Sequence, residues 1–286
     1  MVRLNYVEFY ITNVCNLSCK GCNRFNDTKF SGFQKWDDYK DVYSEWSKHI
    51  EFNLFALMGG EPLLNSTFYD WLEGLTNLWP TSYVKIATNG FRLPFHKKLY
   101  SHLRNNKKIL LSISVHNKEH KPKINQYIND FLEGDFTYEF DNTPYRQKLY
   151  ITDANKVRIE VLYNWWFHQG AIIRDKGIET LHNSDPEKAH SICHSRECHH
   201  FDKGLLYKCG PSALFKEYDN QYPLELSAED RKLMNSVEYL SVVDDNITKK
   251  SFIDNIKNPI PQCKFCPEQY CGEQIFSQEK KDLKIQ

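Results

Sequence analysis

The chain has 286 residues, with 37 basic and 37 acidic side chains and a formal net charge of zero. A neutral chain argues against a protein that binds nucleic acid or an anionic membrane through bulk charge, and 41% hydrophobic residues exclude global disorder. No apolar run reaches the roughly 18 residues of a membrane span. The first ten residues carry Arg3, Asn5 and Glu8, unlike a signal peptide. We therefore expect a cytoplasmic protein that contacts neither membrane nor nucleic acid.

Strand-like and helix-like segments alternate through the first two-thirds of the chain. The pattern predicts strands over residues 6–13, 52–58, 83–89, 109–116 and 156–164. Between them it predicts helices over residues 36–49, 67–78, 96–105 and 123–132. Such alternation is typical of βαβ units with a parallel sheet. Since no dinucleotide-binding glycine fingerprint is present, we predict an α/β fold with a partial (β/α)6 TIM-like barrel.

The alternation breaks down in the later part of the chain. Residues 135–153 are rich in polar and aromatic side chains and read as an insertion, either a lid over the barrel mouth or a packed surface excursion. A hairpin is predicted over residues 199–208, and a helix over residues 226–240 with Ser227 as its N-cap. The tail from Glu279 is expected to fray. We divide the chain into a barrel of residues 1–187 and a small cysteine-rich domain of residues 188–286.

The nine cysteines fall into three clusters. An odd number of cysteines without an export signal argues against a disulfide scaffold and favours metal or redox use. The clusters are Cys15, Cys19 and Cys22; Cys193, Cys198 and Cys209; and Cys263, Cys266 and Cys271.

The first cluster has the spacing C-x3-C-x2-C and directly follows the first predicted strand. Three thiolates on one short loop can hold three irons of a [4Fe–4S] cluster and leave the fourth iron open. A structural zinc site would need a fourth ligand close by. The spacing of Cys15, Cys19 and Cys22 therefore favours an iron–sulfur cluster with an open position.

The loop Val14–Cys22 resembles the signature of the radical S-adenosylmethionine (SAM) superfamily. Gly59-Gly60-Glu61-Pro62 after the second strand is similar to the family's GGEP motif, and Thr88-Asn89-Gly90 to its TNG element. The resemblance covers about residues 1–180. It implies that SAM binds the open iron, with its amino group on the loop formed by Gly59, Gly60, Glu61 and Pro62, and that Asn89 belongs to the cofactor site. Gly21 stands where the family usually has an aromatic residue, so Phe25 becomes a candidate for contacting the adenine.

Two later strands offer polar side chains to the interior of the barrel. Alternate residues of a barrel strand face inward, which selects Leu110, Ser112, Ser114 and His116 on one strand and Arg158, Glu160, Leu162 and Asn164 on the other. The resemblance implies that such residues contact the cofactor: Ser112 or Ser114 its ribose, and Arg158 its carboxylate. The alternative is that Arg158 and Glu160 pair as buried ions, either with each other or with residues of neighbouring strands. Glu8 and Tyr10 are candidates for lining a substrate pocket.

The six later cysteines resemble the C-terminal SPASM/twitch extension of radical SAM enzymes, which holds auxiliary iron–sulfur clusters. Two clusters ligated by cysteine alone need eight thiolates, so six cysteines predict one auxiliary [4Fe–4S] cluster. We expect Cys209, Cys263 and Cys266 as ligands, with Cys193 or Cys198 completing the set and Cys271 as a further candidate. Zinc is the alternative occupant, and His194, His199 and His200 are either packing residues or ligands of a mixed site.

The resemblance implies an enzyme that reductively cleaves SAM to a 5′-deoxyadenosyl radical. The radical would abstract hydrogen from a small-molecule or peptide substrate, giving oxidation or another C–H modification, with flavodoxin or ferredoxin as external electron donor. No residue is assigned a catalytic role. One alternative is a radical SAM enzyme that modifies tRNA or another nucleic acid, which the neutral charge disfavours. The other is a non-catalytic iron–sulfur electron carrier or scaffold, which would not need the loop of residues 59–62.

Overall fold

A computed structural model describes residues 2–26, 30–143, 146–163, 166–168, 170–176, 178–269, 272–274 and 277–280. At its centre is a ten-stranded sheet with the order β14-β13-β12-β1-β3-β4-β5-β8-β7-β6. Six neighbouring strands in this order run parallel. They are β12 (His199–Asp202), β1 (Val2–Tyr10), β3 (Ile50–Met58), β4 (Tyr83–Thr88), β5 (Ile109–Val115) and β8 (Arg158–Tyr163). The fold is therefore α/β with a large, mainly parallel sheet, consistent with the predicted partial barrel.

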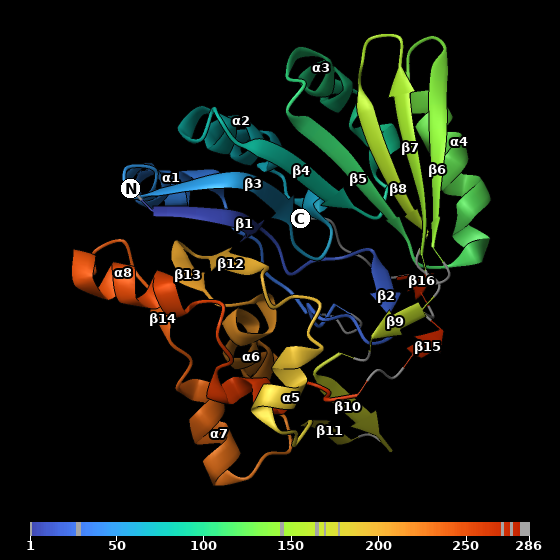
Figure 1. The fold of residues 1–286 in the computed structure, drawn as a ribbon. Helices are drawn as coiled ribbons and strands as arrows, with labels where there is room; N and C mark the ends of the chain where they lie inside the picture. The colour runs from blue at the N-terminus through green and yellow to red at the C-terminus, as the bar shows by residue number, and fades with distance from the viewer. Residues whose placement is uncertain are drawn as a thin grey trace.

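The connecting helices lie along one face of the curved sheet (Figure 1). They are α1 (Trp36–Trp46), α2 (Phe68–Leu78), α3 (Lys97–Asn105) and α4 (Lys121–Phe131), so each predicted helix is confirmed within a few residues. Periodic apolar residues direct them to the sheet; in α2 these are the buried Phe68, Trp71, Leu72 and Leu75. No helix in the described part of the chain is long and apolar enough to cross a membrane.

The predicted insertion is a β-hairpin at the edge of the sheet, and the lid interpretation is wrong. It forms β6 (Phe136–Thr143) and β7 (Arg146–Asp153), and β7 pairs antiparallel with β8. Alternating aromatic and polar residues suit a strand, and the edge of β8 offers it backbone hydrogen bonds. Tyr138 and Phe140 are 61% and 59% exposed and line a shallow cavity beside Ile128 of α4.

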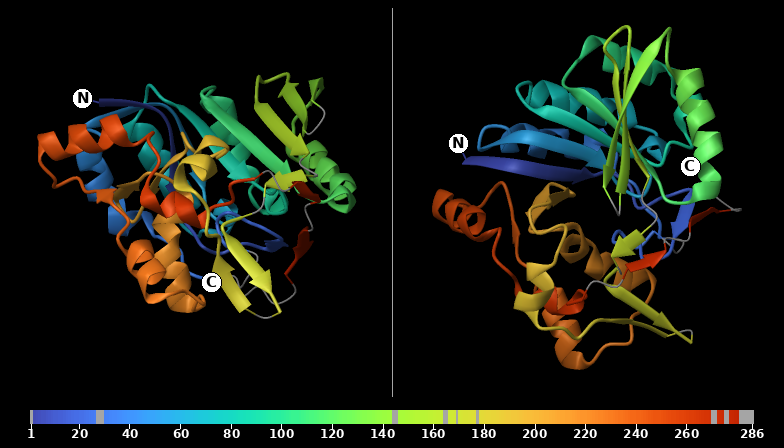
Figure 2. Two further views of the ribbon diagram at one scale, coloured as in Figure 1. Left: turned by 60° about the horizontal axis from the view of Figure 1, so that its bottom comes forward. Right: turned by 45° about the vertical axis from the view of Figure 1, so that its right-hand side comes forward.

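The C-terminal third extends the same sheet on the other side of β1. The predicted hairpin is confirmed as β12 and β13 (Leu205–Tyr207), and β14 (Tyr239–Leu240) follows as the edge strand. The predicted helix begins at its Ser227 cap as α7 (Ala228–Asn235), but ends before residue 240 because the chain enters β14. Helices that the sequence analysis missed are α5 (Pro186–Ser191), α6 (Gly210–Gln221) and α8 (Asn246–Asn255). In Figure 2, α6, α7 and α8 (orange to red) lie on the other side of β1 from β4 and β5.

Short elements bring distant segments together around the cysteine loop. The chain adds the 3-10 turns η1 (Pro62–Leu64), η2 (Leu93–Phe95), η3 (Lys118–His120) and η4 (Pro261–Phe265), and a separate hairpin of β10 (Ile172–Asp175) and β11 (Ile178–Leu181). Two other pairs join β9 (Trp166–His168) to β15 (Gly272–Gln274), and β2 (Leu17–Cys19) to β16 (Ser277–Glu279). Glu279 thus lies in a strand, and its carboxylate is 2.8 Å from the Lys123 ammonium. The rest of the predicted frayed tail, residues 281–286, lies outside the described residues.

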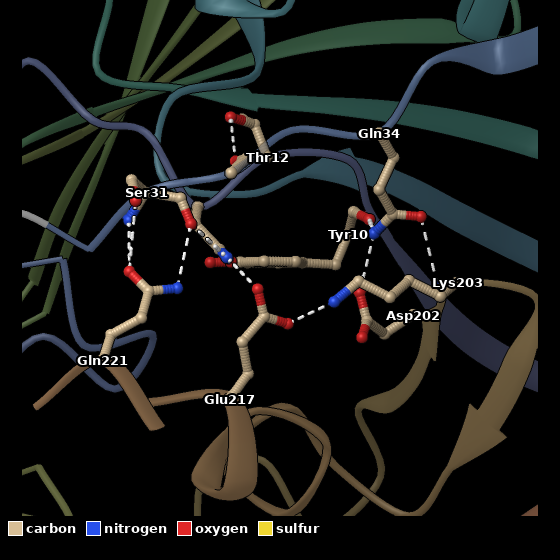
Figure 3. A network of polar contacts seen from close by, with 10 residues as sticks. Tyr10, Thr12, Ser31, Gln34, Asp202, Lys203, Glu217 and Gln221 are labelled. Atoms are coloured by element: carbon tan, nitrogen blue, oxygen red, sulfur yellow. Dashed lines mark hydrogen bonds and ion pairs between the residues drawn. The ribbon is translucent and has the colours of Figure 1, made fainter. Parts of the chain in front are cut away.

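Polar contacts fix the loop after β1 against the C-terminal elements (Figure 3). Asn13 donates to a carboxylate oxygen of Glu217 on α6 at 2.7 Å, and the other oxygen of Glu217 pairs with Lys203. Gln34 donates to Asp202 of β12 at 2.7 Å. These contacts position α6 and the hairpin next to the loop that carries the first three cysteines.

Candidate active site

The carboxyl ends of β1, β3, β4 and β5 surround a cavity of about 170 Å³. The predicted site residues that line it come from four separate parts of the chain. They are Cys15, Cys19 and Cys22 after β1, Gly59 and Gly60 after β3, Asn89 after β4, and Ser114 at the end of β5. The structure therefore brings together most of the residues that the first two motifs predicted.

The three cysteines of the first loop lie close to one another. Burial raises the pKa of the Cys15 thiol well above its ordinary value, and negative charge on Glu61, Cys19 and Cys22 acts in the same direction. The Asn89 amide lies 3.8 Å from the Cys15 sulfur, and Cys19 contacts the Ser277 hydroxyl of β16 at 3.1 Å. Thus neighbouring strands, including the C-terminal β16, hold the loop in place.

Gly59 and Gly60 allow the loop after β3 to run against the loop after β1. The Gly60 amide donates to the Thr12 carbonyl at 2.7 Å. A Cβ atom on Gly60 would lie 2.4 Å from the Val14 carbonyl oxygen, and one on Gly59 would lie 2.5 Å from that of Thr12. No side chain fits at either position, so glycine is required for this close approach.

Glu61 and Pro62 shape the cofactor loop from behind and do not line the cavity. Glu61 is fully buried, and its carboxylate accepts hydrogen bonds from the Thr88 hydroxyl and the Asn89 amide, both at 2.7 Å, and from the Leu63 amide at 3.0 Å. Pro62 is buried at the start of η1. Their side chains therefore position the loops after β3 and β4, and their place in the cofactor-binding loop stays a prediction.

The Glu61 carboxyl should make folding stability depend on pH. Burial raises its pKa to about 7 from 4.5, so the folded protein binds this proton more tightly than the unfolded chain does. Stability is then lost as the pH rises from about 4.5 to 7, by at most about 3 kcal/mol at 1.36 kcal/mol per pKa unit. We expect Glu61→Gln to remove this part of the pH dependence in thermal unfolding of the metal-free protein.

The same variant should also lower stability at every pH. One carboxylate oxygen becomes an NH2 group that cannot accept a hydrogen bond, at a cost of about 1–3 kcal/mol. Asp202→Asn is the matched comparison. Burial also raises the pKa of Asp202, in the network of Figure 3, to about 7, so this variant should change the pH dependence of stability in the same direction. An unaltered pH slope for Glu61→Gln would contradict the assignment.

Buried polar atoms without a protein partner gather in this cavity. Within the described residues they include Nε and Nη1 of Arg24, Oδ1 of Asn26 and Nδ1 of His116, all three residues lining the cavity. Each such atom costs about 1–3 kcal/mol when it stays unpaired, so a polar ligand or water in the cavity would be stabilised by pairing with these groups. Three thiols, a loop that only glycine permits and these unpaired groups fit a [4Fe–4S] cluster with SAM. The sequence analysis missed Arg24 and Asn26, whose only signal was their position just after Cys22.

The two other strand candidates lie outside the cavity. Ser112 faces the sheet interior as predicted, but its hydroxyl donates to Glu160 at 2.8 Å, beside the Lys85 ammonium at 3.0 Å from the same oxygen. Arg158 is exposed at the opposite, amino-terminal end of β8 and donates to the Lys107 carbonyl. Ser114 therefore remains the ribose candidate, whereas Arg158 does not line this cavity. Glu160 pairs with Lys85 and Lys148 of other strands of the sheet, in agreement with the alternative of satisfied buried ions. Asn164 lies outside the described residues.

The residues expected to contact the adenine or to line a substrate pocket are packed elsewhere. Phe25 is buried and stacks on Phe215 of α6, with ring centroids 5.6 Å apart. Glu8 is buried and pairs with Arg24, and Tyr10 is buried with its ring 5.2 Å from His200. None of the three lines this cavity in the described part of the chain.

A second cavity, of about 490 Å³, contains four of the later cysteines. They reach it from three segments: Cys193 after α5, Cys209 as the N-terminal cap of α6, and Cys263 and Cys266 on and after η4. Burial raises the pKa of Cys263 to about 11, and the nearby thiols of Cys209 and Cys193 add to this effect. The four thiols thus form one group.

The remaining cysteines and histidines are placed differently. Cys198 is not among the described residues lining this cavity, and burial raises its pKa to about 12 with Glu8 as the next cause. His199 and His200 contact the Lys208 carbonyl and Glu8, at 3.0 and 3.4 Å, whereas His194 lines the cavity. Cys271 lies outside the described residues. In the described part of the chain, no three His, Cys, Asp or Glu side chains are placed to hold a single metal ion.

Residues 9–133 match the family model of the Radical SAM superfamily. The match covers less than half of the chain and indicates a Radical SAM superfamily domain over these residues. Among curated proteins, none matches the chain significantly.

Solved structures similar to the chain include SuiB of Streptococcus suis bound to S-adenosylmethionine, with 17% identity and a TM-score of 0.36 over 46% of this chain and 32% of SuiB. Native anSMEcpe with bound AdoMet matches with 19% identity and a TM-score of 0.36, over 46% of this chain and 40% of that one. Native anSMEcpe with AdoMet and the Cp18Cys peptide matches with 19% identity and the same TM-score, over 45% and 40%. The matched region spans less than half of each of these chains.

Proposed function

We propose that this protein is a radical SAM enzyme that reductively cleaves SAM and abstracts hydrogen from a small molecule or a peptide, leading to oxidation or another C–H modification. The observation that carries this proposal is the cavity in which three thiols, the glycine loop and unpaired polar side chains meet at the carboxyl ends of parallel strands. When bound, the cluster and SAM would supply a 5′-deoxyadenosyl radical, the species that abstracts hydrogen from the substrate.

The protein's own side chains would bind and orient these groups. Cys15, Cys19 and Cys22 would hold the cluster, and Gly59 and Gly60 would admit the amino acid part of SAM. Glu61 would keep the two loops in register through its three hydrogen bonds. Ser114 and Asn89, which line the same cavity, would donate hydrogen bonds to the cofactor.

We further propose that Cys193, Cys209, Cys263 and Cys266 hold one auxiliary [4Fe–4S] cluster, in a SPASM/twitch-like domain of residues 188–286. A tetrahedral zinc ion has Zn–S bonds of about 2.3 Å and draws its sulfurs around a single atom. A cavity of about 490 Å³ lined by four thiols suits a four-iron cluster better. Such a cluster would accept or relay an electron from the substrate, or bind substrate, and Asn23 lines both cavities.

Anaerobic reconstitution with iron and sulfide tests this function. We expect about 8 irons per chain, from two four-iron clusters, and formation of 5′-deoxyadenosine when a one-electron donor such as flavodoxin, ferredoxin or dithionite is added with SAM. About 4 irons with bound zinc would instead indicate a structural metal at the second site, and about 12 irons would indicate two auxiliary clusters. Clusters without any 5′-deoxyadenosine would contradict the enzyme and favour an electron carrier.

The proposed substrate class is supported by the net charge of the chain. With 37 basic and 37 acidic residues, the chain lacks the excess positive charge of a nucleic-acid binder. Incubation with deuterated metabolites and peptides should place deuterium in 5′-deoxyadenosine for the true class. Deuterium transfer from tRNA or DNA alone would overturn this choice.

A further inference from the structure

Arg24 is a buried cation with most of its hydrogen-bond donors unused. It is 4% exposed and lines the cofactor cavity two residues after Cys22. Its Nη2 donates to Glu8 and lies 3.8 Å from the Met58 sulfur. Its Nε and Nη1, which together carry three N–H bonds, have no acceptor in the described part of the chain.

The guanidinium is held in this position by three elements. On β1, Glu8 accepts from Nη2, and the same carboxylate oxygen lies 3.4 Å from Nδ1 of His200 on β12. At the start of α6, Gly210 packs against the guanidinium so closely that a Cβ there would lie 2.5 Å from Cζ. Arg24 is therefore positioned by contacts that do not use its free donors.

The unpaired donors require an acceptor, and its chemistry can be inferred. A buried donor without a partner costs about 1–3 kcal/mol, and more when the group is charged. Arginine stays charged in proteins, so an anion would form charge-assisted bonds roughly twice as strong as those of a neutral acceptor. The planar guanidinium matches the geometry of a carboxylate.

We infer that Arg24 binds a carboxylate group of the substrate, so that the substrate is a carboxylic acid or an acidic peptide. This inference rests on the proposed function. Asn23 lines both the cofactor cavity and the second cavity, and Gly210 directly follows Cys209 of the second thiol group. The bound carboxylate would thus lie between the two proposed clusters. The carboxylate of SAM is the other source of the same chemistry, and the experiment separates the two.

The test uses formate labelled with carbon-13 as the smallest carboxylate, so that substrate shape plays no part. With three non-hydrogen atoms, formate is expected to bind with a dissociation constant of about 1 mM at best. The reconstituted protein is reduced with and without the non-cleavable nitrogen analogue of SAM, and each sample is titrated with formate to about 100 mM. Pulsed EPR of the cluster then measures hyperfine coupling to the labelled carbon.

We expect coupling in the wild-type protein, a loss of at least tenfold in apparent affinity in Arg24→Gln, and partial retention in Arg24→Lys. If Arg24→Gln does not fold, the double variant Glu8→Gln/Arg24→Gln removes both partners of the buried ion pair and avoids an isolated charge. Lys85→Gln is the matched control, because this cation lies on the interior face of the sheet outside the cavity and leaves Glu160 paired with Lys148.

Absence of coupling in the wild type, or equal coupling in Arg24→Gln, would overturn the inference. So would displacement of formate by the SAM analogue together with tenfold weaker analogue binding in Arg24→Gln, because Arg24 would then bind the carboxylate of SAM. Failure of the proposed function looks different: the EPR signal of the cluster would not respond to the analogue at all.

Discussion

Replacing Cys15, Cys19 and Cys22 together by alanine is expected to abolish formation of 5′-deoxyadenosine and to leave about four irons per chain at the second site. The three thiols line the first cavity, whereas the other thiol group lies in a separate cavity formed by later elements. The two sites should therefore load independently. The measurements are iron content, the EPR spectrum after reduction, and 5′-deoxyadenosine by chromatography.

Variants of the second thiol group test whether the two sites load independently. Cys263→Ala/Cys266→Ala should lose the second set of irons while the first cluster still responds to SAM. Cys198→Ala is the matched control, because this thiol is partly buried between the sites but is not among the described residues lining the second cavity. Normal 5′-deoxyadenosine formation in the first triple variant would refute the cluster assignment. Loss of iron in Cys198→Ala would show that this residue is a ligand.

Gly60→Val should weaken SAM binding by at least tenfold while the first cluster still assembles. The new Cβ would lie 2.4 Å from the Val14 carbonyl oxygen and 2.6 Å from Asn26 Oδ1, well below normal contact distance. The loop after β3 must then move away from the loop after β1, at a cost of about 1–3 kcal/mol for overpacking. SAM titration, followed by the EPR signal of the reduced cluster, measures the effect.

Gly134→Asn serves as the control for Gly60→Val. Gly134 has a positive φ of 76°, and a Cβ atom added to it would meet no other atom within 4 Å. Asparagine tolerates this backbone conformation. The control should therefore bind SAM like the wild type. If Gly60→Val also binds SAM normally, the loop of residues 59–62 is not part of the cofactor site.

Local patterns in the sequence were sufficient to predict the helices and strands of the first half of the chain and the position of the first cysteine loop. Hydrophobic periodicity depends on neighbouring residues, so the parallel strands and α1 to α4 could be predicted within a few residues. The cysteine triplet and Gly59–Pro62 each occupy a short loop after a strand. Because carboxyl ends of parallel strands meet at one edge of a sheet, their convergence followed from the predicted fold.

The position of each residue along its strand, relative to the cavity, could be determined only from the tertiary structure. Alternation correctly predicted that Ser112, Ser114 and Glu160 face the interior of the sheet. How close each residue lies to the carboxyl end of the sheet depends on strand register, which is determined only by the pairing of neighbouring strands. Register places Ser114 at the cavity and Ser112 below it. It places Arg158 at the opposite end of β8, where it pairs with Thr152 of β7.

Residue types and their spacing predicted the chemistry of the chain, whereas the tertiary structure shows which of these residues line the same cavity. Six later cysteines allowed several ligand sets, and in the described part of the chain Cys193, Cys209, Cys263 and Cys266 line one cavity because three distant segments converge there. The unpaired donors of Arg24 depend on contacts with β1, β12 and α6. Contacts between residues nearly 200 positions apart leave no periodic trace in the sequence, since each arises only when the sheet forms.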